Sequence, residues 1–226
     1  MRKMPQVTEA TGPHSGQPIA TAGPPPREAA AALVLLHGRG GDADGMLELA
    51  RAVAPPTFAC LAPQAAGHTW YPLRFTEPVA RNEPHLSSAL SVLHALLEQM
   101  MAEGVPAGRI ALLGFSQGAC LGLEFARRRG QRLGAVLGLS GGLIGEAVAP
   151  AAGPPVLAGM PVLLGCSERD PHIPLPRVQE TAAVMRALGA EVVTRIHPGA
   201  GHGVTGDEVA LARGILARVA GAAPPA

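Results

Sequence analysis

The part of this sequence best suited to chemistry is the motif G-F-S-Q-G at residues 114–118. It follows an apolar run that ends at Leu113 and precedes a run from Ala119 that is compatible with a helix. A serine on such a strand-to-helix turn is held in a strained backbone conformation, which lifts its hydroxyl clear of the sheet. The flanking glycines leave room for the tight turn, because side chains there would collide with the neighbouring strand and helix. The pattern predicts that Ser116 is a nucleophile.

A serine hydroxyl attacks efficiently only when a base takes its proton and a third group holds that base in the right tautomer. For a nucleophile on this kind of turn, the chain order is serine, acid, histidine. His202 lies in a glycine-rich loop between the last predicted strand and the last predicted helix, where a base can reach the nucleophile. Asp170 follows the apolar run at residues 162–165, at the carboxyl end of another strand. We therefore expect Ser116, Asp170 and His202 to form a catalytic triad.

Other titratable residues downstream of the serine have simpler interpretations. The rival acid, Glu168, is expected to be a surface carboxylate that pairs with the arginine after it. His197 belongs to a predicted strand and is followed by a proline, which favours a structural role, and His172 is expected to line its loop. Asp207 comes after the proposed base and is expected to cap or open the last helix.

The loop at residues 37–42, with the sequence H-G-R-G-G-D, follows the first long apolar strand. In this arrangement such a loop supplies the second half of an oxyanion hole. The main-chain N–H groups of Arg39 and Gln117 are the expected donors, and losing one such donor costs about 10²- to 10³-fold in turnover. Because both donors belong to the main chain, side-chain substitution at either position is expected to leave catalysis largely intact. The Arg39 guanidinium is expected to steer substrate or to cover the rim of the site.

The same loop supports a competing interpretation. Residues 38–43 match G-x-G-x-x-A after a strand, which is a dinucleotide-binding pattern. That function also needs an acidic residue about 20 residues further on, at the end of the second strand. The sequence there is L-A-P-Q at residues 61–64, with no carboxylate. We therefore expect no bound dinucleotide.

Short apolar runs alternate with longer helical patterns between residues 31 and 220. Continuous apolar strands separated by helices indicate a parallel sheet that is buried on both faces, with right-handed crossovers. The expected fold class is therefore α/β, with a mostly parallel central sheet and helices on both faces. Active sites of such sheets collect at the carboxyl ends of strands, where the residues above fall. The expected strands are 32–37, 58–63, 110–115, 135–139, 162–165 and 192–197, and the expected helices are 44–53, 84–103, 117–129, 176–188 and 206–220.

The two ends of the chain differ in composition from this central part. Residues 1–30 are rich in Pro, Gly, Thr and Ala and are expected to form an irregular arm, with one edge strand around residues 17–22. Residues 221–226 are expected to be a frayed tail. Because the sequence shows no internal repeat and no second domain, residues 31–220 are interpreted as a single domain.

The composition argues against several function classes. Lys and Arg number 18 against 17 Asp and Glu, so the net charge of +1 gives no pull toward nucleic acid or acidic membranes. The arginine run at residues 127–129 falls at an expected helix end, where it complements the helix dipole. Cys60, Cys120 and Cys166 lie in apolar surroundings, which predicts reduced, buried thiols. No secretory signal and no membrane-spanning apolar stretch is visible, so a cytoplasmic protein without membrane insertion is expected.

Together these motifs resemble the phospholipase/carboxylesterase family of α/β-hydrolases, whose relatives include the acyl-protein thioesterases. The resemblance implies an α/β-hydrolase fold, with the triad and the oxyanion donors at the positions named above. It also implies hydrolysis of carboxylic esters through an acyl-enzyme, without a metal or another cofactor. The stretches at 62–64 and 69–72 are more similar to bacterial carboxylesterases than to eukaryotic thioesterases. The resemblance covers about residues 31–220 and rests on L-H-G-R-G-G-D at 36–42, G-F-S-Q-G-A at 114–119, Asp170 with I-P at 173–174, and G-H at 201–202.

A cluster of aromatic residues is the candidate substrate pocket. Trp70, Tyr71 and Phe75 lie in a proline-bounded loop after the second long strand, in a chain with few aromatics. They are interpreted as a hydrophobic wall over the nucleophile, to which Met46 and Leu73 add, while simple packing of a surface loop is the alternative. The loop is short and no long apolar lid is visible, which predicts small to medium soluble esters as substrates.

The residues leave more than one function open. A serine carboxylesterase acting on a small-molecule ester is the leading hypothesis, and a lysophospholipase or acyl-thioesterase would use the same residues. A non-catalytic α/β-hydrolase-fold protein that binds a small ligand is the alternative from a different class. Such a protein need not keep a nucleophile, an acid and a base at separate strand ends. A homodimer is compatible with the apolar surface, and no nucleic-acid partner is expected.

Overall fold

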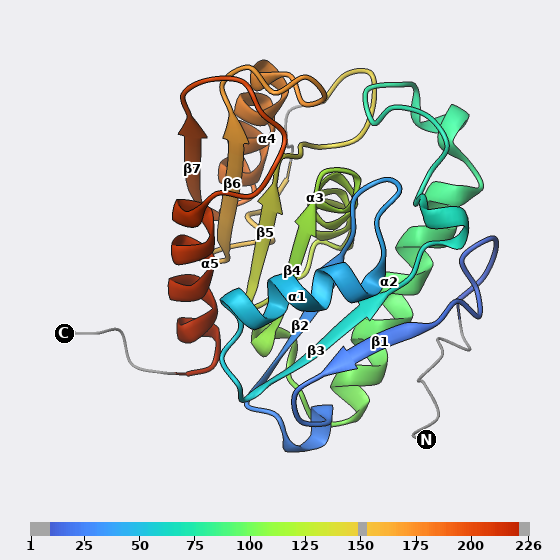
Figure 1. The fold of residues 1–226 in the computed structure, drawn as a ribbon, viewed down its shortest axis with the longest axis vertical. Coiled ribbons are helices and arrows are strands. Elements are labelled where there is room, and N and C mark those ends of the chain that lie inside the picture. Colours follow the sequence, from blue (N-terminus) through green and yellow to red (C-terminus); the bar gives the residue numbers. More distant parts are fainter. Residues whose placement is uncertain (1–9, 149–152, 222–226) are drawn as a thin grey trace.

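A seven-stranded sheet, drawn as arrows in Figure 1, forms the centre of the protein. The computed structural model describes residues 10–148 and 153–221. The strands are β1 (Ile19–Ala22), β2 (Ala31–Leu36), β3 (Phe58–Pro63), β4 (Ile110–Phe115), β5 (Ala135–Leu139), β6 (Pro161–Ser167) and β7 (Glu191–His197). Their order across the sheet is β1-β3-β2-β4-β5-β6-β7. β1 runs antiparallel to β3, and the other neighbouring pairs are parallel.

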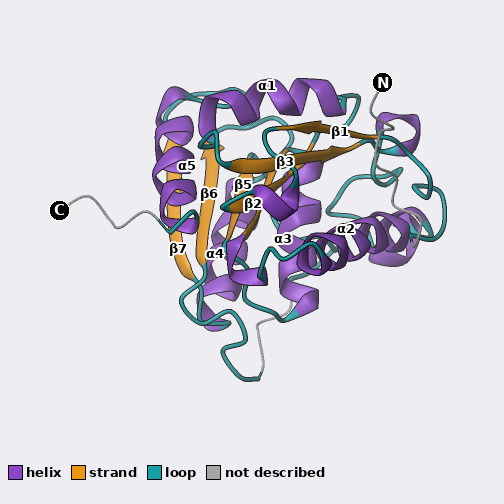
Figure 2. Cartoon of the chain, turned by 90° about the horizontal axis from the view of Figure 1, so that it is seen from below, coloured by secondary structure: helices purple, strands orange, loops and turns teal. Residues whose placement is uncertain are grey.

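Helices cover both faces of this sheet, as Figure 2 shows. They are α1 (Ala43–Val53), α2 (His85–Ala102), α3 (Gln117–Arg129), α4 (Leu175–Ala187) and α5 (Gly206–Val219). α1 and α5 share one apolar cluster with one face of the sheet, and α2, α3 and α4 share another with the opposite face. Short 3-10 turns lie at Pro26–Glu28, Ala66–His68, Val79–Asn82 and Ala107–Arg109.

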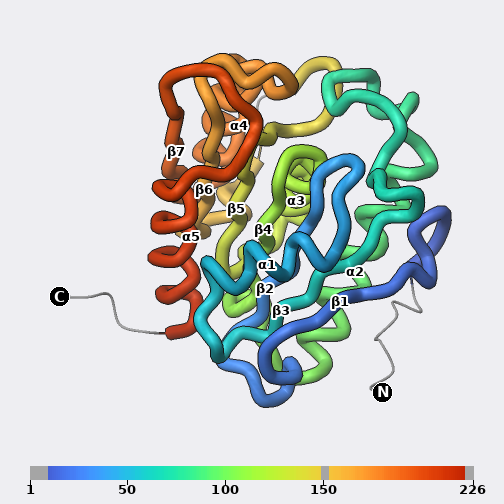
Figure 3. The backbone as a smooth tube through the Cα atoms, in the orientation of Figure 1, coloured from blue at the N-terminus to red at the C-terminus, as the bar shows by residue number. Residues whose placement is uncertain are grey.

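Burial explains why the inner strands read as unbroken apolar runs. Every residue of β2, β3 and β5 is buried, because helices cover both of their faces. β7 forms an edge of the sheet, and its residues alternate between exposed and half-buried. In Figure 3 the chain leaves β2, β6 and β7 by loops at the same end of the sheet. These three loops carry Arg39, Asp170 and His202.

The α/β architecture predicted from the sequence is confirmed, and strands and helices form close to the expected ranges. β6 is longer than expected because Cys166 and Ser167 continue the pairing with β7. The expected edge strand forms as β1, which pairs with β3, and His14 before it is buried. Residues 1–9 of the expected arm and residues 222–226 of the expected tail lie outside the described residues.

Two further expectations concern the thiols and the membrane. Cys60, Cys120 and Cys166 are buried and free, as their apolar surroundings predicted. Burial raises the pKa of the Cys120 thiol to about 12, so this group is unreactive as a thiolate at neutral pH. None of the described helices is both long and apolar enough to cross a membrane.

Candidate active site

Ser116 stands on the turn between β4 and α3 with φ of 53° and ψ of −117°, a conformation that non-glycine residues rarely adopt. A Cβ on Gly114 would lie 2.3 Å from the carbonyl oxygen of Gly118. A Cβ on Gly118 would lie 2.1 Å from the carbonyl oxygen of Leu36 in the neighbouring strand. Both positions therefore require glycine, and the turn is the strained one that the motif predicts.

The structure brings Ser116, His202 and Asp170 together from the ends of three different strands. Nε2 of His202 lies 2.8 Å from Oγ of Ser116, and Nδ1 lies 2.8 Å from Oδ2 of Asp170. Because a carboxylate only accepts hydrogen bonds, Nδ1 carries the proton and Nε2 is left free to accept one from the serine. The three side chains that the chain order grouped together are therefore in contact.

Asp170 is held in place and in its charged form by its surroundings. Its side chain is fully buried, and Oδ1 accepts the main-chain N–H groups of His172 at 2.8 Å and Ile173 at 3.0 Å. Burial alone would raise the pKa of this carboxyl, but the hydrogen bonds from His202 and from the two N–H groups outweigh it. The net pKa of Asp170 is therefore below its usual value.

The rival residues have other contacts. His197 Nε2 lies 2.9 Å from Oγ1 of Thr205, the N-cap of α5, which agrees with a structural role. Asp207 lies in the first turn of α5, where it pairs with Arg195. Glu168 is exposed. None of these three side chains contacts the hydroxyl of the nucleophile.

His172, which was expected only to line its loop, contacts the ring of His202. Its ring lies nearly perpendicular to that of His202, with centroids 4.8 Å apart, and Phe115 contacts the same ring at 4.9 Å. These two neighbours restrict rotation of the His202 ring. Position in the sequence did not predict this contact, because it depends on how the loops after β6 and β7 meet.

The loop after β2 lies directly against the nucleophile. A Cβ on Gly38 would lie 3.3 Å from Cβ of Ser116, so this glycine permits the close approach. Gly38, Arg39 and Gln117 border the same cavity as the nucleophile. The N–H of Gln117 is in the first turn of α3, where helical N–H groups have no intrahelical acceptor.

His37 fixes the base of this loop. Its Nε2 accepts the N–H of Ala65 at 3.1 Å, so the proton sits on Nδ1, which donates to the carbonyl of Gly38 at 2.7 Å. Burial lowers the pKa of His37 and keeps the ring neutral. The sequence identified this histidine only as the start of the loop.

A cavity of about 630 Å³ opens beside Ser116. Of the predicted wall residues, Tyr71, Leu73 and Phe75 line it, together with Ile173 from the loop after β6. Charged groups border it as well. The full lining is Gly38, Arg39, Tyr71, Pro72, Leu73, Arg74, Phe75, Glu77, Arg81, Phe115, Ser116, Gln117, Cys120, His172, Ile173 and His202.

Trp70 and Met46, by contrast, do not line this cavity, which corrects the expectation for both. Trp70 is fully buried, and its indole N–H donates to the carbonyl of His37 at 2.9 Å. Its ring is therefore tied to the start of the loop after β2. Met46 lies on α1 and packs in the apolar cluster on the other face of the sheet. The aromatic-cluster pattern could not separate residues that face the cavity from those that face the core.

The side chains of Arg39 and Gln117 are both committed to the loop at residues 69–75. The Arg39 guanidinium donates to the carbonyls of Tyr71, Pro72 and Leu73 at 2.7 to 3.0 Å, a position that fits the expected cover of the rim better than steering of substrate. The Gln117 amide donates to Tyr71 at 2.8 Å and accepts the N–H of Trp70 at 2.8 Å.

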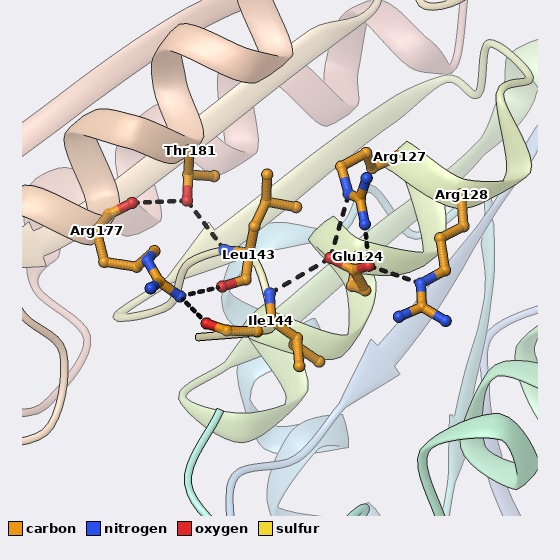
Figure 4. A network of polar contacts seen from close by, with 8 residues as sticks. Glu124, Arg127, Arg128, Leu143, Ile144, Arg177 and Thr181 are labelled. Atoms are coloured by element: carbon orange, nitrogen blue, oxygen red, sulfur yellow. Dashed lines mark hydrogen bonds and ion pairs between the residues drawn. The ribbon is translucent and has the colours of Figure 1, made fainter. Parts of the chain in front are cut away.

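Arg177 of α4 packs behind Phe75 and bonds to the loop after β5, and the bonds to that loop are drawn in Figure 4. The guanidinium lies 5.7 Å from the centre of the Phe75 ring and donates to the carbonyls of Leu143 and Gly145 at 2.9 and 2.8 Å. The N–H of Gly145 in turn donates to the carbonyl of Phe75 at 2.8 Å. The loop after β5 is thereby tied to the cavity wall.

Glu124 ties the same loop to α3, as Figure 4 also shows. Its fully buried carboxylate accepts from Arg127 and Arg128 and, at 3.3 Å, from the N–H of Ile144. Arginines of the run at the end of α3 thus pair with Glu124. The sequence had predicted only that the run complements the helix dipole. A lone glutamate in an apolar helix, three and four residues before arginines, is the signal that could have found it.

Similarity to known proteins agrees with this geometry. The sequence profile described as Phospholipase/Carboxylesterase matches residues 19–219. The chain belongs to this family. The match includes β1, which the sequence analysis placed in the N-terminal arm but which pairs with β3. Among the residues that the structure describes, no group of three or more His, Cys, Asp and Glu could hold a metal ion.

Individual relatives differ in how much of the chain they cover. A crystal structure of a phospholipase/carboxylesterase from Dyadobacter fermentans is 38% identical, with a TM-score of 0.84, and the match covers 90% of this chain and 97% of that one. Acyl-protein thioesterase 1 of Gibberella zeae is 31% identical over 59% of this chain and 58% of its own length. Acyl-protein thioesterase 1 of Schizosaccharomyces pombe is 31% identical over 46% and 47%. The chain therefore spans about half the length of these curated relatives.

Proposed function

We propose that this protein is a serine carboxylesterase that hydrolyses small to medium carboxylic esters through an acyl-enzyme intermediate. The observation that carries the proposal is the series of hydrogen bonds from Ser116 through His202 to Asp170, with 2.8 Å at each step. A strained serine in front of the imidazole and a buried carboxylate behind it meet the needs of nucleophilic acyl transfer. Membership of a hydrolase family supports the same reaction class.

In the first half-reaction, His202 Nε2 takes the Ser116 proton while Oγ attacks the carbonyl carbon of the ester. The imidazolium then protonates the leaving alcohol as the tetrahedral intermediate collapses to the acyl-enzyme. A water activated by the same ring attacks the acyl carbon and releases the acid, and the serine regains its proton. Asp170 stays ionised throughout and stabilises the imidazolium through Nδ1–H.

The main-chain N–H groups of Arg39 and Gln117 are the proposed oxyanion donors. The start of α3 favours negative charge, because the helix dipole and the free N–H groups both point toward it. The close approach of Gly38 to Ser116 supports the N–H of the next residue, Arg39, as the second donor. Each donor of this kind contributes about 3 to 4 kcal/mol to the stability of the transition state.

The cavity supports the choice of substrate size. Its volume of about 630 Å³ fits a small or medium ester. The apolar side chains of Leu73, Phe75 and Ile173 would contact the acyl or alcohol chain. An acyl-thioesterase with the same residues is the second candidate, and the names of the Gibberella zeae and Schizosaccharomyces pombe relatives favour including thioesters in the test.

The deciding experiment is covalent labelling combined with substitution of the nucleophile. A fluorophosphonate should add once to the folded protein, with the adduct on Ser116, and Ser116→Ala should lose the label and about 10⁴- to 10⁶-fold in turnover. Matched oxygen esters and thioesters then separate the two candidates. A folded protein that takes no label and turns over neither substrate class would instead be a non-catalytic binding protein.

A further inference from the structure

The loop at residues 69–75 has no regular structure, yet its main-chain carbonyls are held by hydrogen bonds. Every carbonyl from Trp70 to Phe75 accepts a hydrogen bond from a group outside the strands. Buried polar groups of the main chain need such partners, and here side chains supply most of them. The donors therefore determine where this wall of the cavity lies.

The carbonyl oxygen of Tyr71 accepts from Thr69 of the same loop at 3.2 Å and from two donors outside the loop. Nη2 of Arg39 lies 2.9 Å and Nε2 of Gln117 lies 2.8 Å from the carbonyl oxygen of Tyr71. Arg39 lies in the loop after β2, and Gln117 begins α3, so the shared carbonyl joins two separate elements. These are also the two residues whose main-chain N–H groups are the proposed oxyanion donors.

We propose that Arg39 and Gln117 are positioning residues, whose side chains set the spacing of the two oxyanion N–H groups by binding the same carbonyl of Tyr71. This inference rests on the proposed esterase function. Gln117 has little freedom, because α3 fixes its main chain. Arg39 is flanked by glycines, and a Cβ on Gly40 would meet no atom within 4 Å. Apart from the bond from the Gly40 N–H to the carbonyl of His68, the Arg39 side chain is therefore the main tie between this segment and the cavity wall.

The guanidinium is suited to this task. A planar fork with several N–H groups can hold three successive carbonyls at once, which a lysine ammonium on a flexible stem does not reproduce. A displacement of about 1 Å at a donor can cost about 10²-fold in rate. Substitutions of these side chains should therefore lower kcat, contrary to the expectation from the sequence.

The test is a double-mutant cycle on the full chain with p-nitrophenyl butyrate. Arg39→Lys keeps the charge, and Gln117→Glu keeps the shape and the acceptor for the N–H of Trp70 but removes the donor to Tyr71. Each single variant should lower kcat by about 10- to 100-fold with KM changed less than threefold. The double variant should lose less than the product of the two single losses, because both act through one carbonyl.

A matched control separates positioning from general damage. Arg213 of α5 also donates to a main-chain carbonyl, that of Ala52, at 2.7 Å, but lies outside the cavity lining. Arg213→Lys should keep kcat within twofold, even if its melting temperature falls as far as that of Arg39→Lys.

The outcomes are distinct for the two proposals. Unchanged kcat in both site variants, a rise in KM alone, or fully multiplicative losses would overturn the positioning role while wild-type turnover and labelling of Ser116 still support the esterase. A wild-type protein without turnover and without label would overturn the esterase proposal itself.

Discussion

The carboxylate of Asp170 lies 2.8 Å from Nδ1 of His202, on the side of the ring opposite the serine. The carboxylate cannot turn away, because two main-chain N–H groups hold its other oxygen. A fixed acceptor at Nδ1 means that the ring presents an unprotonated Nε2 to the nucleophile. The loop after β6 thus determines the tautomer of His202 in the loop after β7.

Replacing this acceptor tests the relationship directly. Asp170→Asn should lower kcat by about 10³- to 10⁴-fold, because an amide keeps the shape but neither enforces the tautomer nor stabilises the imidazolium. The measurement is steady-state turnover of p-nitrophenyl butyrate by folded protein. Glu168→Gln is the matched control for the rival acid and should stay within twofold of wild type. The reverse ranking would assign the acid role to Glu168.

Two buried histidines predict how stability depends on pH. His37 and His14 each accept a main-chain N–H with one ring nitrogen, and burial lowers the pKa of both rings. The unfolded chain therefore binds protons more readily than the native protein, beginning near pH 6.5. Their stabilisation is present above pH 6.5 and is lost as the pH falls through the lowered native pKa values.

Urea unfolding between pH 8 and pH 5 measures this effect. The free energy of unfolding should decline below about pH 6.5, by at most about 1.4 kcal/mol per pH unit for each histidine. His14→Gln should flatten the decline, whereas His94→Gln, on the exposed side of α2, should leave its slope unchanged. Equal slopes in wild type and His14→Gln would show that His14 does not contribute.

The sequence was sufficient where the signal is local or follows chain order. The G-x-S-x-G motif at residues 114–118 located the strained turn, and the order of strand ends identified the two residues, Asp170 and His202, that the structure places in line with Ser116. It was insufficient where a side chain bonds a distant main-chain group. The bonds from Arg39 to the carbonyls of residues 71–73, and those of Arg177 to the loop after β5, join segments more than 30 residues apart. Neither periodicity nor spacing records such contacts.

Trp70 shows the same limit in packing. Its neighbours in the sequence line the cavity, but its own ring is fully buried and bonds His37. The irregular loop has no side-chain period that could assign each residue to the inside or the outside. Only the path of the main chain decides which aromatic ring faces the substrate.

The buried carboxylate of Glu124 predicts a large effect on stability. Glu124→Gln should lower the free energy of unfolding by about 2 to 3 kcal/mol, since it removes the counter-charge of Arg127 and Arg128. Both arginines are about one-third exposed, which keeps the value below that of a fully buried pair. Glu98→Gln removes a surface partner of Arg129 and should cost less than about 1 kcal/mol. Chemical denaturation of both variants provides the comparison, and equal losses would contradict the prediction.

The cavity wall predicts a limit on acyl chain length. Wild-type kcat/KM should be at least about 10-fold higher for p-nitrophenyl butyrate than for p-nitrophenyl palmitate. Each buried methylene contributes about 0.8 kcal/mol to binding, but the methylenes of a long chain that extend beyond the cavity contribute nothing. Phe75→Leu enlarges the cavity toward Arg177 and should move the preference to longer chains, by a few-fold for octanoate relative to butyrate. Phe58 is buried on β3 against the other face of the sheet, so Phe58→Leu should lower stability to a similar extent without changing the preference. Equal or faster hydrolysis of palmitate by wild type would exclude the small pocket, and a matching shift in Phe58→Leu would point to general loosening of the fold.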